Sequence, residues 1–195
     1  MAILTYKFDD QTQLSPHFNA REFRCQCGQP HETLIASELI DKLESLYTAL
    51  NCSKIIVTSG YRCPEHDKAV GGTSSGQHTK GSAADVCCYG QDGQPISSKT
   101  VCCKAQDLGF TGIANITSSY QYTHLDVRTG YRWLGDETKG NGTVTEDFYK
   151  YFGIKKTTET TSILKGIDVS YCQNEVDWDA AKASGLVDFA ILRAG

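Results

Sequence analysis

The sequence lacks any run of apolar residues long enough to cross a membrane, and it lacks blocks of lysine and arginine. A spanning helix needs roughly 18 consecutive apolar residues, so no membrane insertion is expected. The net charge is −4 and the isoelectric point is near 5.7, so the chain lacks the basic surface typical of nucleic-acid-binding proteins. The first ten residues show neither the basic nor the apolar region of a secretory signal, which predicts synthesis in the cytoplasm without a signal peptide.

Cysteine is also scarce for a disulfide scaffold: the chain has nine cysteines in 195 residues, whereas such scaffolds have roughly 8–10%. The odd number leaves at least one thiol unpaired in a monomer, and most are expected to be reduced, buried thiols. A structural zinc site at Cys25, Cys27, Cys63 and His66 is an alternative, because Cys63 and His66 have a suitable spacing. The single residue between Cys25 and Cys27 is tighter than usual, so this second zinc site is not expected.

Hydrophobic periodicity and turn residues predict a mixed α+β protein. A Gly-rich, polar stretch over 71–82 is typical of a loop. The expected helices are 34–50, 98–108 with Ser98 as its cap and Gly109 as its stop, and 145–152, and the expected strands are 54–58, 83–89, 112–117 and 122–127.

Two histidines and a carboxylate stand in or beside these strands. His78 lies in the Gly-rich loop, Asp85 in the strand that follows it, and His124 in a later strand. Three such ligands leave a fourth position open to water in a catalytic zinc site, and zinc lowers the pKa of its water toward ~7. The spacing alone is also compatible with an alternative, in which the three residues are surface groups that lie far apart in the folded protein. A phosphate-binding loop is excluded because the order is Lys80-Gly81-Ser82 and not Gly-Lys-Ser/Thr.

Several strings of residues in this region resemble one family. These are Ser-Gly-Tyr-Arg-Cys-Pro over 59–64, His-x-x-Gly-x-Ala-x-Asp over 78–85 and His-Leu-Asp-Val over 124–127. They resemble, in the same order, the zinc D-alanyl-D-alanine carboxypeptidases, which cut peptidoglycan, and the likeness runs from about Leu14 to Trp133. The resemblance implies a hedgehog-type fold, a single sheet with flanking helices. It also implies that His78, Asp85 and His124 hold one catalytic zinc ion and that Arg62 faces the substrate or the oxyanion.

The chain departs from the family pattern at the residue that activates water. Many members carry an acid or a histidine three residues before the last zinc ligand, where this chain has Gln121, which cannot accept a proton. Gln121 is expected to orient the water by hydrogen bonding. Asp126 shares a strand face with His124 and is an alternative base, a partner behind the metal ligand, or a carboxylate bonded to backbone. Ser75, Gln77 and Tyr122 are expected to contact the substrate.

The C-terminal residues resemble a different family. Lys-Gly-Ile-Asp-Val-Ser-Tyr-Cys-Gln over 165–173 resembles the start of family 25 glycoside hydrolases, which are β/α-barrel muramidases, and Asp168 matches their first acid. Strands at 166–169 and 189–193 around a helix at 178–184 predict one βαβ unit. A whole barrel takes about 200–250 residues, so no muramidase activity is expected. The predicted domains are a zinc peptidase domain over 1–154, a linker over 155–164 and a truncated muramidase-like fragment over 165–195.

Together these features predict a zinc-dependent peptidase that hydrolyses amide bonds of peptidoglycan stem peptides, as a D-Ala-D-Ala carboxypeptidase or an endopeptidase. The two resemblances side by side predict a phage or prophage endolysin, expected to be a monomer that acts on the cell wall after release. The alternative is a non-catalytic module that binds cell wall and retains its metal for structure, and the feature that favours it is Gln121.

Overall fold

The computed structural model describes residues 2–117, 119–140, 142–156, 166–169 and 189–192. The chain divides into two compact units, Met1–Lys155 and Lys156–Gly195, and each is described by itself. Within the described ranges, no helix is both long enough and apolar enough to cross a membrane.

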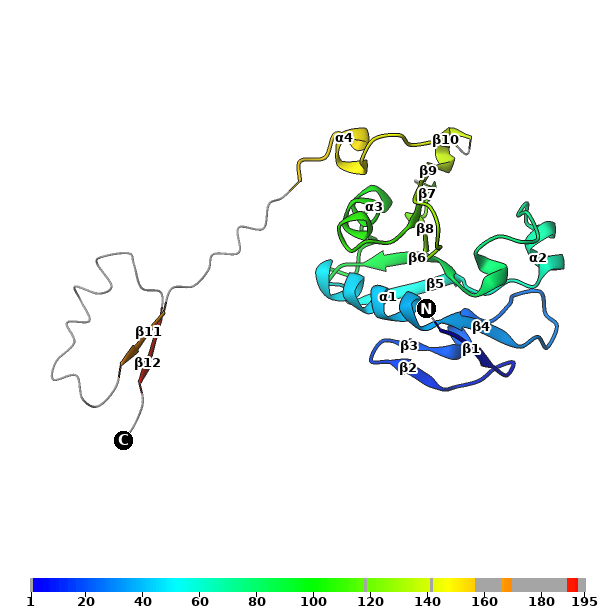
Figure 1. The fold of residues 1–195 in the computed structure, drawn as a ribbon, viewed down its shortest axis with the longest axis horizontal. Coiled ribbons are helices and arrows are strands. Elements are labelled where there is room, and N and C mark those ends of the chain that lie inside the picture. Colours follow the sequence, from blue (N-terminus) through cyan, green and yellow to red (C-terminus); the bar gives the residue numbers. More distant parts are fainter. Residues whose placement is uncertain (1, 118, 141, 157–165, 170–188, 193–195) are drawn as a thin grey trace. The chain divides into compact units, whose positions relative to one another are not determined.

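The first unit is built on a six-stranded mixed sheet (Figure 1). Neighbouring strands are antiparallel except for one parallel pair, β7 with β9. The strand order is β10 (Gly142–Thr143), β9 (Trp133–Asp136), β7 (Gly112–Thr117), β8 (Tyr122–Asp126), β6 (Ala83–Tyr89) and β5 (Lys54–Ser59).

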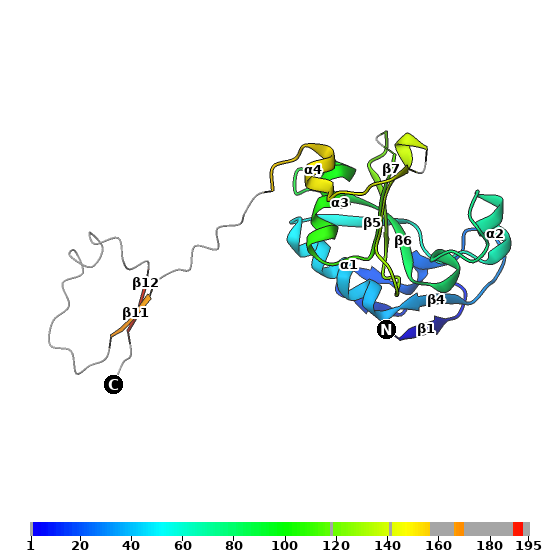
Figure 2. The ribbon, with the colours of Figure 1, turned by 45° about the horizontal axis from the view of Figure 1, so that its top comes forward.

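Helices cover the two faces of this sheet unequally. The helices α1 (Ser37–Ala49), α3 (Ser98–Asp107) and α4 (Phe148–Phe152) lie on one side, and the short helix α2 (Pro64–Ala69) lies on the other (Figure 2). Alternate strand residues such as Ala84, Val86 and Leu125 belong to the buried apolar core. Because strand side chains alternate between faces, Asp85 and His124 point to the opposite face, away from that core.

Two small sheets flank the main one. The strand β1 (Ile3–Tyr6) pairs with β4 (Thr33–Ala36), and β2 (Gln13–Ser15) pairs with β3 (Phe18–Asn19), which leads into the 3₁₀ turn η1 (Ala20–Phe23). The predicted helix over 34–50 was wrong at its start, because residues 34–36 belong to β4. Their apolar side chains fit a strand as well as a helix, and the pairing with β1 decides between the two.

The other predicted elements of this unit are present with small shifts. The strand over 83–89 is observed with the predicted bounds. Ser97, not Ser98, is the residue that precedes α3, and its side chain makes no capping hydrogen bond. The last predicted helix, over 145–152, begins only at Phe148. The mixed α+β class is confirmed, and the hedgehog-type assignment stays a prediction.

In the second unit, the described residues form two strands. The strand β11 (Gly166–Val169) pairs in parallel with β12 (Phe189–Leu192), and Asp168 lies opposite Ile191. The predicted helix over 178–184 and most of the predicted linker lie outside the described residues. The barrel-fragment assignment and the predicted domain boundaries therefore stay predictions.

Candidate metal centre

Three metal-binding side chains meet on the open face of the sheet. The antiparallel register of β6 and β8 sets Asp85 directly opposite His124, and His78 comes from the 3₁₀ turn η2 (His78–Lys80) just before β6. His124 Nδ1 lies 2.9 Å from Asp85 Oδ1 and 3.1 Å from His78 Nε2, and the last two atoms are 3.3 Å apart. The structure therefore brings together the three residues expected to be metal ligands.

The far side of each imidazole is fixed by an acceptor. His78 Nδ1 lies 2.7 Å from the carbonyl oxygen of Gly60, and His124 Nε2 lies 3.1 Å from Asp126 Oδ2. A carbonyl or an ionised carboxylate can only accept a hydrogen bond, so each of these nitrogens carries the hydrogen. In the neutral imidazoles the two inward nitrogens are then lone-pair donors, and they face the Asp85 oxygen. A cation between three such atoms would interact favourably with all of them, so the residues fit a zinc ion.

Electrostatics at this spot favour positive charge. Burial alone would lower the pKa of His124, but its hydrogen bonds to Asp126 and Asp85 outweigh burial and raise the pKa to about 9. Burial alone would raise the pKa of Asp85, but hydrogen bonds to His124 and His78 hold it well below its usual range. In the metal-free protein a proton therefore takes the place that a divalent cation would fill.

Arg62 holds the second oxygen of Asp85. Its Nη2 lies 2.5 Å from Asp85 Oδ2, its Nε donates to Ser59 Oγ over 2.8 Å, and its Nη1 lies 3.4 Å from Asp67 Oδ1. The guanidinium also lines the cavity beside the three ligands. Arg62 therefore orients a metal ligand as well as facing the space where the resemblance predicts substrate.

Asp126 is fully buried behind the cluster. Besides His124 it accepts from the side-chain Nε and the backbone N–H of Arg128, over 2.9 and 3.0 Å. A Cβ on Gly112 would come within 2.1 Å of Asp126 Oδ2, so only glycine leaves room for this carboxylate. The sequence left Asp126 as a base, as a partner behind the metal ligand or as a carboxylate bonded to backbone. The geometry favours the partner of His124, because both carboxylate oxygens of Asp126 already accept hydrogen bonds.

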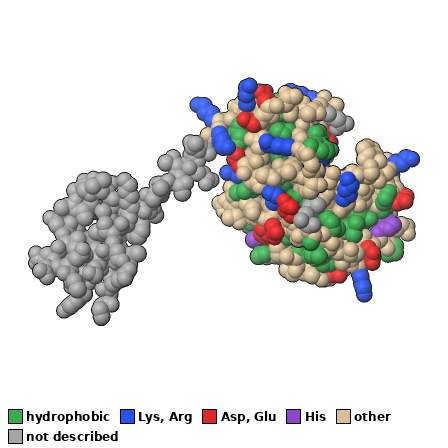
Figure 3. Space-filling model, viewed as in Figure 1, with side chains coloured by type: hydrophobic (Ala, Val, Ile, Leu, Met, Phe, Trp, Pro, Cys, Tyr) green, Lys and Arg blue, Asp and Glu red, His purple; other side chains and the backbone are tan. Residues whose placement is uncertain are grey.

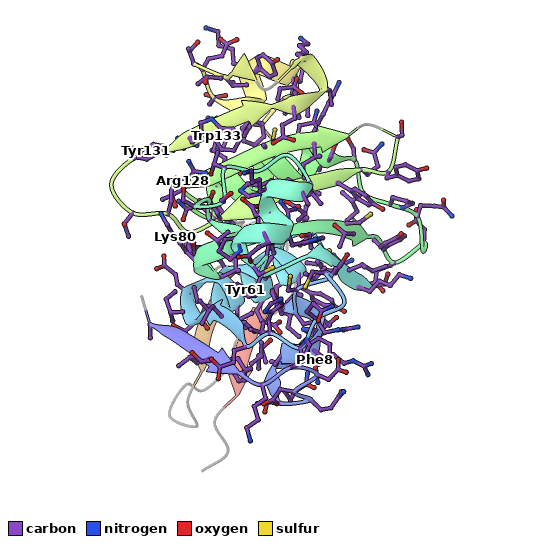
Figure 4. The ribbon with its side chains drawn as sticks, turned by 90° about the vertical axis from the view of Figure 1, so that its right-hand side faces the viewer. Phe8, Tyr61, Lys80, Arg128, Tyr131 and Trp133 are labelled. Atoms are coloured by element: carbon purple, nitrogen blue, oxygen red, sulfur yellow. The ribbon has the colours of Figure 1, made fainter. Side chains whose placement is uncertain are left out.

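A cavity of about 420 Å³ opens over the three ligands. Figure 3 shows the surface hollowed between the segment that carries α2 and the segment that carries β9 and β10. Arg128 lies on its wall and stacks 5.0 Å from the ring of Trp133 and 5.2 Å from that of Tyr131 (Figure 4). The sequence reasoning did not single out these aromatic and guanidinium groups.

Of the three residues expected to contact substrate, only one lines this cavity. Gln77 lines it, and its Oε1 accepts from Ser82 Oγ over 2.7 Å. Ser75 is exposed and is not among the lining residues, and Tyr122 stacks instead on Tyr120 with ring centroids 5.6 Å apart. Direct contact of Ser75 and Tyr122 with a ligand in this cavity is not supported.

Glu137 is a cavity residue that the sequence reasoning missed. It begins the 3₁₀ turn η3 (Glu137–Lys139) directly after β9 and lines the cavity together with the three ligands. Glu137 is exposed at the mouth of the cavity. Partial desolvation still raises the pKa of its carboxyl group, an effect that the charge of His124 opposes and the charge of Asp85 increases. No local motif marks Glu137, because its place depends on the parallel pairing of β9 with β7.

Gln121 does not face the ligands. Its Oε1 accepts from the backbone N–H of Ser98 over 2.8 Å, at the N-terminus of α3 on the core side of the sheet. Gln121 is three positions before His124, and strand alternation puts side chains at an odd spacing on opposite faces. The side chain of Thr123 lies on the same side as that of Gln121, because its hydroxyl also bonds to Ser98. The expectation that Gln121 orients a water molecule at the metal is therefore corrected: it caps a helix.

The cap gives a direct prediction for Gln121→Ala. Losing a side-chain acceptor at a helix N-terminus costs about 1 kcal/mol, so we expect the free energy of unfolding to fall by about that amount in urea denaturation. Zinc content and turnover should match those of the wild type. A large loss of turnover with an unchanged unfolding curve would restore the interpretation of Gln121 as a residue of the reaction.

Comparisons with known proteins agree with this geometry. A family model described as Peptidase M15 matches residues 16–126, a stretch of more than half the chain that contains all three candidate ligands. No curated protein matches the chain. The family resemblance drawn from the sequence strings is confirmed at the level of peptidase M15, whereas the D-alanyl-D-alanine carboxypeptidase activity and the muramidase resemblance stay predictions. The chain belongs to the peptidase M15 family, whose members are metallopeptidases.

Proposed function

We propose that this protein is a zinc peptidase that hydrolyses amide bonds in the stem peptides of peptidoglycan. The observation that carries the proposal is that His78, Asp85 and His124 each direct one potential metal-ligand atom to the same point, on the wall of an open cavity. The sequence strings over 59–64 and 124–127 support the substrate class, because they resemble peptidoglycan-cleaving carboxypeptidases.

Each residue around the site has a distinct task in this proposal. A bound zinc ion would polarise the scissile carbonyl and activate water at neutral pH. Gly60 and Asp126 hold the imidazoles of His78 and His124 in the tautomers that turn a lone pair inward. Arg62 keeps Asp85 in place, and its remaining N–H groups can donate to the developing oxyanion or to a substrate carboxylate.

Glu137 is the proton acceptor of the proposed reaction. Among the described residues that line the cavity, the other carboxylates are Asp85, a candidate ligand, and Asp67, which is buried and paired with Arg62. No hydrogen bond or ion pair of the Glu137 side chain is found in the described structure. Its carboxylate can therefore take a proton from the attacking water and return it to the leaving amine.

Glu137→Gln tests this assignment. We expect kcat to fall by about 10²-fold or more, while zinc content and the thermal midpoint stay at wild-type values. Only the ionised carboxylate accepts a proton, so the wild-type kcat should rise with pH as the Glu137 carboxyl group ionises. That rise should disappear in the variant.

Glu146→Gln is the matched control, because Glu146 is a half-buried glutamate that is not among the residues lining the cavity and whose carboxylate pairs with Lys150 over 2.9 Å. It should leave kcat and its pH profile unchanged. A Glu137→Gln enzyme with wild-type kcat and the same pH profile would remove Glu137 from the reaction.

The setting of the activity is part of the same proposal. The parallel pairing of β11 and β12 and the muramidase-like residues over 165–173 support a bifunctional endolysin of a phage or prophage. Such a protein would be made in the cytoplasm and act as a monomer on the cell wall after release, with stem peptides as its partner and neither nucleic acid nor membrane bound.

Digestion of purified muropeptides with and without a chelator tests the function. Mass spectrometry should show stem peptides shortened by hydrolysis in the presence of zinc, and the change should be lost with chelator and restored by added zinc. Unchanged stem peptides with zinc-loaded protein that still sediments with cell wall would favour the non-catalytic binding module instead.

A further inference from the structure

A second group of soft ligands lies outside the candidate active site. Cys25 and Cys27 follow η1, and Cys63 is the residue that precedes α2. The three Sγ atoms all lie within 4.8 Å of one another, although Cys63 is 38 positions from Cys25 in the chain. Cys25 and Cys63 are buried, and Cys27 is half-buried.

Each of the three sulfur atoms accepts a hydrogen bond from the backbone. The N–H of Cys63 donates to Cys25 Sγ over 3.3 Å, and those of Gln29 and His66 donate to Cys27 and Cys63 Sγ over 3.4 Å each. Hydrogen bonds to a charged acceptor are about twice as strong as neutral ones, so these N–H groups would stabilise thiolates bound to a cation, whereas without a cation burial raises the pKa of the Cys63 thiol. Three thiolates this close repel one another unless a cation lies between them.

We propose that Cys25, Cys27 and Cys63 hold a second, structural zinc ion through three thiolates. Zn–S bonds of about 2.3 Å put the sulfurs of a tetrahedral site roughly 3.8 Å apart, so small side-chain shifts from the present separations suffice. Because Cys27 is only half-buried, water can reach the fourth position. His66 itself is not within the cluster, where its backbone N–H serves Cys63.

The zinc would fix the strand ends that build the active site. Tyr61 N–H donates to the Phe23 carbonyl over 2.7 Å, and a Cβ on Gly60 would lie 2.5 Å from Phe23 Cα. The segment with Cys25 therefore packs closely on the segment that carries Gly60 and Arg62, which hold His78 and Asp85 in place. A cross-link through Cys63 ties these two segments together at the next residue.

Metal content of the full chain tests the proposal independently of activity. Purified under reducing conditions, the wild type should carry about two zinc ions, and Cys27→Ser and His124→Ala should carry about one each. Cys87→Ser is the matched control and should keep both, because Cys87 belongs to neither group of candidate ligands and a hydroxyl can replace its thiol as donor to the Tyr120 carbonyl. After cobalt substitution, thiolate-to-metal absorption should persist in His124→Ala and vanish in Cys27→Ser.

A second measurement needs no variant. In the native wild type, alkylation of Cys25, Cys27 and Cys63 should be slow and should accelerate once a chelator is added, as read by peptide mass spectrometry. Equal zinc content in Cys27→Ser and wild type would overturn the proposal. A disulfide would also overturn it. The disulfide would be seen if two of the three cysteines resist alkylation in denaturant and chelator when no reductant is present. If His124→Ala keeps as much zinc as the wild type while the thiolate-to-metal absorption is present, the result would count only against the catalytic site.

Discussion

His124→Ala should abolish turnover of stem peptides, with a loss of about 10³-fold or more. Its Nδ1 is one of three atoms that define the candidate zinc position, and it is the one closest to both of the others. Removing the imidazole leaves two ligands and separates Asp126 from the metal. Zinc at this position should therefore be lost together with activity, as read by metal content and by muropeptide digestion on the same preparation.

His31→Ala is the control for this substitution. His31 lies in a loop far along the chain from the ligands, and its side chain makes no hydrogen bond or ion pair in the described structure. Zinc content, thermal midpoint and turnover should all be retained. A folded His124→Ala protein that keeps both its zinc and its turnover would show that the metal centre is elsewhere.

The part of the site that lies on regular strands could be predicted from the sequence. Asp85 stands in a buried stretch whose bounds were predicted correctly, and the period of two in a strand correctly set His124 and Asp126 on one face. That these strands are neighbours came from the family resemblance, since periodicity does not reveal which strands pair.

Residues brought in by distant pairing could not be predicted. Glu137 and Trp133 reach the cavity because β9 adds in parallel beside β7, a contact with no local sequence signal. Gln121 shows the converse error: its distance from His124 matched the family, but a spacing of three along a strand directs its side chain to the other face, where it bonds to the start of α3. Position in a motif does not by itself fix the face of the sheet on which a side chain lies.

The cysteine cluster shows a third limit. The short spacing of Cys25 and Cys27 argued against a metal site by comparison with common zinc motifs. The structure brings Cys63 to them because Gly60 allows the two segments to touch at Phe23. Spacing rules describe ligands in one loop, whereas here the third thiol of the cluster comes from another segment.

Asp126→Asn should weaken both the fold and the metal site. Asp126 is fully buried, and the side chain of its ion-pair partner Arg128 is only 10% exposed. Removing one charge of a buried pair leaves the other uncompensated, which costs about 3–5 kcal/mol. We therefore expect the free energy of unfolding of the metal-free protein to fall by about 3 kcal/mol, measured by urea denaturation.

Zinc binding should fall by a separate route. The asparagine oxygen can still accept from His124 Nε2, but without the negative charge the imidazole is less basic. Loss of such a partner behind a ligand typically lowers metal affinity by about 10–100-fold, which competition with a chromophoric chelator would measure. Turnover at saturating zinc should then recover in part, in contrast to His124→Ala, where added zinc should restore nothing.

Asp41→Asn is the control for Asp126→Asn, because it removes a carboxylate that has no role in the site or in the buried ion pair. Asp41 is exposed on α1, and its side chain makes no hydrogen bond or ion pair in the described structure, so the unfolding free energy and zinc affinity should stay at wild-type values. If Asp126→Asn also leaves both unchanged, Arg128 must find another acceptor, and Asp126 would neither support His124 nor stabilise the fold. If stability falls and zinc affinity does not, Asp126 serves the fold alone, because the tautomer of His124 would then be set without it.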